Sequence, residues 1–371
     1  MSVEAPAQPI ALALSGGGIR AMAFHLGVLR FMAERRLLER TTRISSVSGG
    51  SLVAGLLFHE AGMRWPGSGD YVSTVYPALR TKLCARSLQW GALRQLLNPL
   101  NLRFALSRAN LLALALKREW GIAARLSDLP TSPEWSINGT TAENGKRFRF
   151  KQGSLGDYTL GYAAPGRFPV ANALAVSAAF PAGFGPLTFD AEQFEWRRRE
   201  WDAAAETAQV VDIGFKRLHL YDGGLYDNLG LEPFFDAGRG RSKHPGHYLV
   251  VSDAGALLPS GFSLGPLNPF RFRRIADIVS DQAHALRVRT FSTYVQQGPD
   301  RGAFIHIATP LTEAGPCPSA KFATEFPTTL RRLTTSEFDC LADHGYNVAR
   351  KVESAYGLGS GPAGKPATVG S

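Results

Sequence analysis

The chain has 371 residues and carries 41 Lys and Arg against 31 Asp and Glu, a formal net charge of +10. Hydrophobic residues make up 44% and charged residues 19%, a globular balance that excludes a mainly disordered protein. The length allows one large domain or two ordinary ones. Excess positive charge is typical of nucleic-acid-binding proteins, but also of arginines scattered over a solvated surface, so composition alone leaves the partner open.

Export, membrane-spanning and metal signals are missing from the sequence. Residues 1–6 lack the basic and apolar regions of a signal peptide, and no uncharged apolar run reaches about 18 residues. No Cys-x-x-Cys pair and no His-Glu-x-x-His spacing occurs, so we expect no metal and no other cofactor. We therefore expect a cytoplasmic protein, with peripheral membrane contact as a further option and its oligomeric state open.

The first sixty residues alternate between strand and helix. An apolar strand at 9–15 leads into three glycines, and apolar residues at helical spacing then predict a helix over 19–38. A second strand at 43–47 ends at Ser48-Gly49-Gly50, where another helix begins at once. This order is typical of parallel α/β architecture.

The rest of the chain extends this pattern. Residues 62–130 are mostly helical and predict a helical insertion or cover. Further strands are expected at 135–141, 147–151, 218–221, 248–252 and 303–308, and helices at 170–181, 271–295 and 336–352. We predict an α/β fold with one domain over 8–355, a central, mostly parallel sheet covered by helices, and a disordered tail over 356–371.

Ser48 stands between a strand and a helix inside a run of small residues. This is the pattern of a nucleophile elbow, where the turn is too sharp for large flanking side chains and the helix N-terminus favours developing negative charge. The usual motif is Gly-x-Ser-x-Gly, and Ser46 replaces its first glycine here. A tightly packed strand–helix turn without chemistry has the same composition, so this segment alone leaves both interpretations open.

The loop Gly16-Gly17-Gly18 opens the first helix. Consecutive glycines at a helix start let backbone N–H groups face an anion. Dinucleotide binding requires an acidic residue at the end of the second strand, and Ser48-Gly49-Gly50 stands there instead. The other interpretation is an oxyanion hole to which Arg20 adds positive charge. Because the ends of strands one and two meet at one sheet edge, this loop and Ser48 are expected to lie together.

The proton acceptor for Ser48 has two candidate forms. A serine α/β-hydrolase would supply a Ser-Asp-His triad. However, none of the histidines that follow Ser48 in the sequence stands in a glycine-flanked loop of the kind that carries a catalytic histidine. Asp222 closes a predicted strand and precedes Gly223-Gly224, which places it as a direct base, although Asp-Gly is also an ordinary turn. A non-catalytic, basic membrane-binding or nucleic-acid-binding protein remains the alternative from another class.

Four ordered blocks resemble segments of the bacterial-type patatin-like phospholipases, and the resemblance extends over residues 10–352. Later segments, Phe326-Pro327-Thr328-Thr329-Leu330 and Gly345-Tyr346, also resemble bacterial members. The four blocks are Ser15-Gly16-Gly17-Gly18-Ile19-Arg20, Ser46-Val47-Ser48-Gly49-Gly50, Ala173-x-x-Val176-Ser177-Ala178-Ala179-Phe180-Pro181 and Asp222-Gly223-Gly224.

The resemblance implies hydrolysis of acyl esters in phospholipids or related lipids through a Ser–Asp dyad and an acyl-serine intermediate. By this resemblance Ser48 is the nucleophile and Asp222 the base. The remaining roles follow in the same way: an oxyanion hole from Gly16, Gly17, Gly18 and Arg20, and neighbouring residues Ser177, Pro181, Gly223, Gly224 and Asn228.

Two basic and apolar segments are candidates for contact with an anionic membrane. They are 256–274 and 100–120, where leucines and phenylalanines stand beside arginines. Cover elements packed on the core with solvated arginine tips have the same pattern. No nucleic-acid-binding motif is present, so we expect a phospholipid or other acyl-lipid substrate and no nucleic-acid partner.

Overall fold

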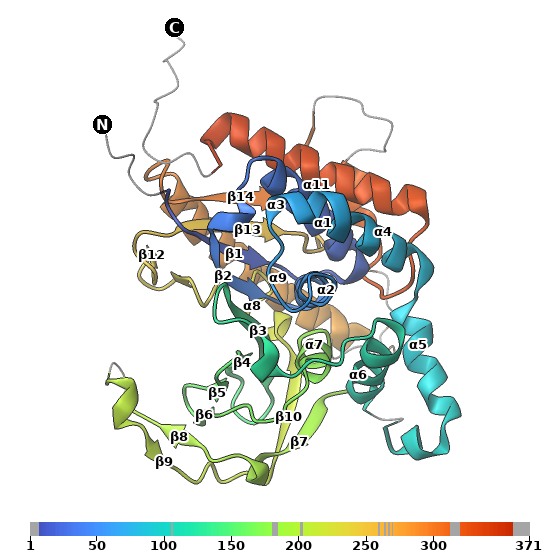
Figure 1. Ribbon diagram of the computed structural model, residues 1–371, viewed down its shortest axis with the longest axis vertical. Coiled ribbons are helices and arrows are strands. Elements are labelled where there is room, and N and C mark those ends of the chain that lie inside the picture. The colour runs from blue at the N-terminus through green and yellow to red at the C-terminus, as the bar shows by residue number, and fades with distance from the viewer. Residues whose placement is uncertain are drawn as a thin grey trace, which may run out of the picture.

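A central β-sheet organises the chain in the computed structural model (Figure 1). The structure describes residues 7–104, 107–179, 185–200, 203–258, 260–262, 265, 268, 270–311 and 320–358. The predicted tail over 356–371 lies outside these residues from 359 onward. No helix in the described ranges is both long and apolar enough to cross a bilayer.

The first half of the sheet is parallel. Its order is β14 (Gly302–His306), β13 (Tyr248–Asp253), β1 (Ile10–Leu14), β2 (Thr41–Ser46) and β3 (Glu134–Thr141). Leu14 lies opposite Ser46 on one side and Ser252 on the other. The residues that follow these three strands therefore emerge together at one edge of the sheet, as expected for parallel strands.

The second half of the sheet is antiparallel. β3 pairs in this way with β4 (Arg147–Phe150) and with β10 (Arg217–Asp222). The α/β class is confirmed, but the sheet is mixed where a mostly parallel one was predicted, because the strands added here are too short to show a pattern. These are β5 (Leu155–Asp157), β6 (Gly161–Ala163), β7 (Leu187–Asp190), β8 (Arg197–Arg198) and β9 (Gln209–Val210), and β11 (Phe235–Asp236) and β12 (Arg241–Ser242) form a separate pair.

Helices cover both faces of the parallel strands. Alternate residues of β1 face two different cores: Leu12 packs in the larger core, and Ala11 packs in a smaller one with Phe291. Burial on both faces explains why these strands are continuously apolar. Helices α1 (Gly18–Glu34), α2 (Gly49–Glu60), α7 (Val170–Ser177) and α11 (Thr335–Tyr356) supply the larger core, and α9 (Phe270–Val295) supplies the smaller one.

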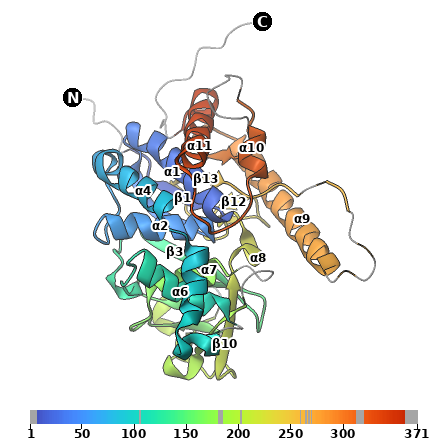
Figure 2. The ribbon, with the colours of Figure 1, turned by 90° about the vertical axis from the view of Figure 1, so that its right-hand side faces the viewer.

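Short helices make up most of the segment at 62–130. It comprises α3 (Ser68–Asp70), a π-helix (Tyr71–Val75), α4 (Tyr76–Ala85), α5 (Leu88–Arg94), α6 (Arg108–Glu119) and 3₁₀ turns at Gln95–Leu97, Pro99–Phe104 and Leu126–Asp128. Figure 1 shows α5 at the outer edge of the molecule, and Figure 2 shows α9 projecting from its side below α10 (Ala320–Glu325).

Candidate active site

Ser48 lies in a strained turn between β2 and α2. Its backbone angles are φ 50° and ψ −118°, outside the regions that side-chain-bearing residues prefer. Its hydroxyl makes no capping bond to α2, and the residue is only half-buried, so the oxygen remains accessible. A Cβ on the next residue, Gly49, would lie 2.3 Å from the carbonyl oxygen of Gly18. The turn therefore has the sharpness of a nucleophile elbow and packs directly on the glycine loop.

A buried chain of hydroxyl groups holds this turn in place. The Ser48 N–H donates to Ser177 Oγ at 3.0 Å, and Ser177, Ser51 and Ser46 are linked through their hydroxyls at 2.8 Å each. The indole of Trp135 donates to Ser46 Oγ at 2.8 Å. Ser46, where the usual elbow motif has glycine, therefore has a structural function: its hydroxyl satisfies a buried indole N–H and continues the chain toward the elbow.

The direction of this chain follows from its two ends. An indole nitrogen can only donate, and the Asn138 carbonyl, which accepts from Ser177 Oγ at 2.7 Å, can only accept. Every hydroxyl between them therefore donates in the same direction, away from Trp135. The Nδ2 group of Asn138 also donates to Ser45 Oγ and to the Ser46 carbonyl, at 2.9 Å each, so β2 and β3 are locked together beneath the elbow.

Asp222 ends β10 and is buried next to Ser48. The N–H of Gly224 donates to Asp222 Oδ1 at 2.7 Å, and the Ser48 hydroxyl lies within hydrogen-bonding reach of the carboxyl group. Burial raises the pKa of Asp222 from its ordinary value of 3.8 to about 7, and the hydrogen bonds from Gly224 and Ser48 oppose this only in part. The carboxyl group can therefore exchange a proton near neutral pH.

The glycine loop closes over the same place. A Cβ on Gly16 would lie 2.3 Å from Asn228 Oδ1 and 3.1 Å from Ser48 Cβ, so only glycine fits between them. Gly17 and Gly18 have φ values of 143° and 62°, which favour glycine. Gly16 N–H donates to the Asn228 carbonyl at 3.0 Å, whereas the N–H groups of Gly17 and Gly18 have no acceptor within the described residues.

Arg20 lies behind this loop with its donors already in use. Its Nη1 donates to the Phe326 carbonyl at 2.6 Å, and its Nε and Nη2 donate to the Ala254 carbonyl at 3.2 and 3.0 Å. The side chain is buried, and burial lowers the pKa of Arg20 to about 10 despite the opposing charge of Asp253. The guanidinium is therefore still charged at neutral pH and clamps two carbonyl groups behind the loop.

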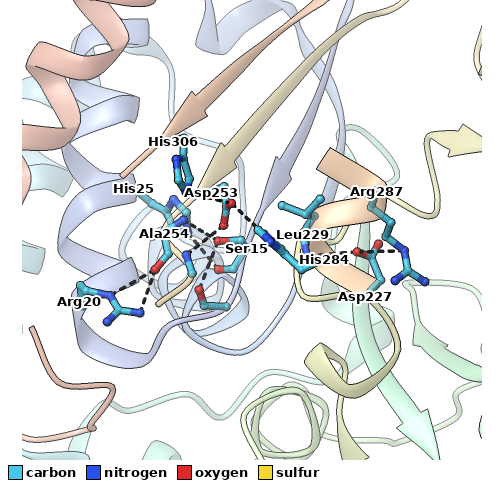
Figure 3. Close-up of polar contacts among 12 residues, drawn as sticks. Ser15, Arg20, His25, Asp227, Leu229, Asp253, Ala254, His284, Arg287 and His306 are labelled. Carbon is cyan, nitrogen blue, oxygen red and sulfur yellow. Dashed lines mark hydrogen bonds and ion pairs between the residues drawn. The ribbon is translucent and has the colours of Figure 1, made fainter. Parts of the chain in front are cut away.

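A second buried carboxylate, Asp253, ends β13 on the far side of the glycine loop (Figure 3). His284 Nε2 lies 2.9 Å and His306 Nε2 3.7 Å from Asp253 Oδ2, and the N–H of Gly255 donates to Oδ1 at 2.9 Å. Burial alone would raise the pKa of Asp253, but the hydrogen bond and charge of His284, with the other contacts, lower it to about 2. The same carboxylate, acting against burial, raises the pKa of His284.

The histidines in this region act as structural groups. His25 Nε2 lies 3.0 Å from the Ser15 carbonyl and Nδ1 lies 2.7 Å from Ser252 Oγ, so Nε2 carries the proton and donates to the carbonyl. Burial lowers the pKa of His25 to about 4, so the ring is neutral. All eight histidines are among the described residues, and none of them has a hydrogen bond to Ser48 or Asp222 there.

The structure brings most of the predicted residues together. Ser48, Asp222, the glycine loop and Asn228 converge, and Gly224 binds the Asp222 carboxylate. Pro181 lies outside the described residues. Gly223 packs against the carbonyl of Asn138, to which Ser177 donates. No group of side chains suited to hold a metal ion occurs among the described residues.

Asp253, Asn138 and Ser51 are residues of this region that sequence analysis missed. For Asp253 a signal exists, because Asp253-Ala254-Gly255 follows a strand just as Asp222-Gly223-Gly224 does. For Asn138 and Ser51 the pattern gives no signal, since both are polar residues inside otherwise ordinary elements.

Comparisons with known proteins agree with this arrangement. The Patatin family model, described as patatin-like phospholipase, matches residues 12–235. A structure of human GIVD cytosolic phospholipase A2 matches with a TM-score of 0.55 and 15% identity, over 94% of this chain and 59% of that one. Another, in complex with methyl gamma-linolenyl fluorophosphonate and terbium chloride, has a TM-score of 0.51 and 14% identity, over 94% and 58%. At this identity the likeness is one of fold, and this chain spans less than two thirds of those structures. No match was found among curated proteins.

Proposed function

Because the chain belongs to the patatin-like phospholipase family, we propose that it is a lipid acyl hydrolase that acts through an acyl-Ser48 intermediate. The observation that carries this proposal is the pairing of a half-buried serine in a strained turn with a carboxyl group whose pKa is about 7. A base with a pKa near neutral pH is in the correct protonation state at neutral pH and still binds a proton strongly.

In the acylation step, Ser48 Oγ attacks the ester carbonyl carbon while its proton moves to the Asp222 carboxylate. The tetrahedral intermediate then collapses, the bond to the leaving alcohol breaks, and Asp222 returns the proton to that alcohol. In deacylation, water gives its proton to Asp222 and attacks the acyl carbon, and Ser48 Oγ leaves and recovers the proton. The N–H bond from Gly224 holds the carboxylate toward Ser48 throughout.

The developing oxyanion is stabilised by the N–H groups of Gly17 and Gly18. These two groups have no acceptor within the described residues, and their loop packs against Gly49, beside the nucleophile. Gly16 provides the space for Ser48, while Arg20 holds the loop through the carbonyl of Ala254. One donor of this kind is typically worth about 3–4 kcal/mol of activation free energy.

A Ser-Asp-His triad fits this geometry less well. The histidines nearest the loop, His25 and His284, are engaged by Ser15, Ser252 and Asp253. In a Ser–Asp dyad the carboxyl group itself must take the proton, and its raised pKa suits that role. The substrate that we propose is a phospholipid or related acyl lipid, taken from an anionic membrane surface by peripheral contact.

Covalent labelling tests the nucleophile directly. We expect methyl gamma-linolenyl fluorophosphonate to phosphonylate the wild type on Ser48 and to leave Ser48→Ala unlabelled, because Ser48 combines an accessible hydroxyl in a strained turn with the neighbouring Asp222 carboxyl group. The measurement is intact mass followed by peptide mapping. In parallel, hydrolysis of phospholipids, lysophospholipids and glycerides by Ser48→Ala should fall by at least about 10⁴-fold.

Ser73→Ala is the matched control, since Ser73 is an exposed helical serine whose hydroxyl contacts only the Gly69 carbonyl and the Thr74 hydroxyl among the described residues. It should keep both labelling and hydrolysis. Labelling at a different serine, or hydrolysis that survives in Ser48→Ala, would contradict the proposal.

A further inference from the structure

Five large apolar side chains of the helical insertion are exposed within thirteen residues. They belong to α5 and the two 3₁₀ turns after it, and we call them the leucine patch: Trp90 at 61% exposure, Leu93 at 47%, Leu97 at 84%, Leu100 at 77% and Leu102 at 57%. The neighbouring helix α6 buries most of its leucines, for example Leu112 and Leu116. A cluster of leucines left outside beside a well-filled core marks an interaction surface.

The charge around the patch is of one sign. Residues 71–118 contain eight basic side chains and no Asp or Glu. Arg94 lies within the patch with 68% of its side chain exposed, and Arg86, just before it, has 58% exposed. Both are near Glu119, the first acidic residue after the segment, at 3.9 and 3.2 Å. Exposed leucines and a tryptophan in a segment whose own charged residues are all basic match the acyl boundary and the headgroups of an anionic bilayer.

This surface is physically continuous with the candidate active site. The N–H of Gln89 in α5 donates to the Leu330 carbonyl at 3.1 Å, and the adjacent Thr329 carbonyl accepts from the N–H of Ile19 at 2.8 Å. A Cβ on Gly18 would lie 2.6 Å from the same Thr329 oxygen. The consecutive carbonyl groups of Thr329 and Leu330 thus connect α5 to the glycine loop. Figure 1 shows α5 at the edge of the molecule, where a membrane surface can contact the helix.

Beside the patch is a hollow lined by a tryptophan and two arginines. Its volume is about 240 Å³, and Trp90 forms one wall. Arg331 in the lining is already bound to Glu337, at 2.6 Å, whereas the neighbouring Arg332 is exposed. A tryptophan beside an exposed arginine is the combination found where a protein meets the polar boundary of a membrane. The full lining is Ser87, Trp90, Arg331, Arg332, Leu333 and Thr334.

We propose that the leucine patch is the surface by which this protein docks on an anionic lipid bilayer, with Leu97 and Leu100 entering the acyl boundary. The proposal deepens the proposed function, on which it rests, by naming where the enzyme meets its substrate phase. It overlaps the sequence expectation for 100–120 only at Leu100 and Leu102, because the rest of that segment is mainly α6, which packs on the core.

The other exposed apolar face lies on α9 and provides a comparison. Ile275, Ile278, Val279 and Leu286 are 59%, 41%, 63% and 60% exposed, but Asp277 and Asp281 stand on the same helix. These two carboxylates lie within the exposed apolar stretch and disfavour its contact with anionic headgroups, while five arginines of α9 flank the stretch. α9 therefore offers a control with similar apolar exposure and mixed charge.

Vesicle sedimentation tests the proposal. All variants carry Ser48→Ala, so that binding is measured without hydrolysis and does not depend on the proposed chemistry. The parent should bind vesicles of phosphatidylcholine with phosphatidylglycerol and bind pure phosphatidylcholine more weakly, with binding that falls as salt rises. Adding Leu97→Ser and Leu100→Ser should lower the partition coefficient by about 100-fold, roughly tenfold for each leucine withdrawn from the acyl boundary.

The α9 control, Val279→Ser with Leu286→Ser, should bind vesicles like the parent. Both double variants replace exposed residues, so we expect their thermal unfolding to be unchanged. Unchanged vesicle binding by Leu97→Ser/Leu100→Ser, or a loss confined to the α9 variant, would overturn the proposal. A dimer in solution that only Leu97→Ser/Leu100→Ser dissociates, with vesicle binding intact, would assign the patch to a second copy instead.

Discussion

Asp222 and Asp253 occupy equivalent positions and have opposite electrostatic environments. Each ends a strand, is followed by two small residues, and accepts an N–H from the residue two positions later, at 2.7 and 2.9 Å. Both side chains are buried. Yet the pKa of Asp222 is raised to about 7, and that of Asp253 is lowered to about 2.

The difference comes from what faces each carboxyl group. Asp222 faces a neutral serine hydroxyl, so burial dominates and favours the protonated form. Asp253 faces His284 and His306, whose hydrogen bond and charges outweigh burial and keep it ionised. One motif thus produces a group able to exchange a proton near neutral pH and another that remains an anion. The Asp253 carboxylate is suited to a structural role, because Asp253 precedes Ala254, whose carbonyl group accepts the hydrogen bonds of Arg20.

The largest expected effect is on catalysis at Asp222. Asp222→Asn keeps the shape and the bond from Gly224 but removes the base, so kcat/KM for a soluble ester should fall by about 10⁴-fold, the scale seen when a catalytic carboxylate becomes an amide. The measurement is steady-state hydrolysis together with urea unfolding. The control is Asp253→Asn, whose folded fraction should lose far less activity. Equal losses of kcat/KM in Asp222→Asn and Asp253→Asn would contradict the assignment of Asp222 as the base and of Asp253 as a structural anion.

The next effect is on stability at Asp253. Asp253→Asn leaves His284, whose pKa this carboxylate raises, without its counter-ion, so the free energy of unfolding should fall by about 3–5 kcal/mol, as for other broken buried ion pairs. Urea unfolding at pH 7 measures this difference. Asp222→Asn, which removes a carboxyl group with no cationic partner in the described residues, should not destabilise the protein. A stable Asp253→Asn protein would show that His284 becomes neutral at little cost in free energy of unfolding.

Much of this comparison could be drawn from the sequence, and part of it could not. The nucleophile turn, the glycine loop and the Asp222 turn are local patterns, because strand ends, glycines and small residues lie next to one another in the chain. The first two converge because parallel strands β1 and β2 end at one edge, whereas Asp222 is brought there by β10, which runs antiparallel to β3. The sequence also predicted both α9 and the strand that ends near Asp253.

The pKa difference and the exposed patch depend on long-range packing. Nothing local to Asp253 indicates that His284, on a helix that begins seventeen residues later, reaches it. The outer strands β5 to β9 were missed because strands of two to four residues carry little periodicity. Leu93 and Leu112 also have similar sequence contexts. Only the tertiary structure determines that Leu93 is exposed to solvent and Leu112 is buried.

The smallest effect tests the comparison through pH. The pKa of Asp222 is raised from 3.8 to about 7, so its contribution favours folding below about pH 4 and is lost as pH rises from 4 to 7. The pKa of Asp253 is lowered to about 2, so its contribution is present above about pH 4 and is lost as pH falls toward 2. The stability of Asp222→Asn relative to wild type should therefore increase by roughly 2–4 kcal/mol between pH 4 and 7. The deficit of Asp253→Asn should instead shrink below pH 4. Urea unfolding at pH 3, 4, 5.5 and 7 measures both trends, and parallel curves for the two variants would mean that the carboxyl groups share one environment after all.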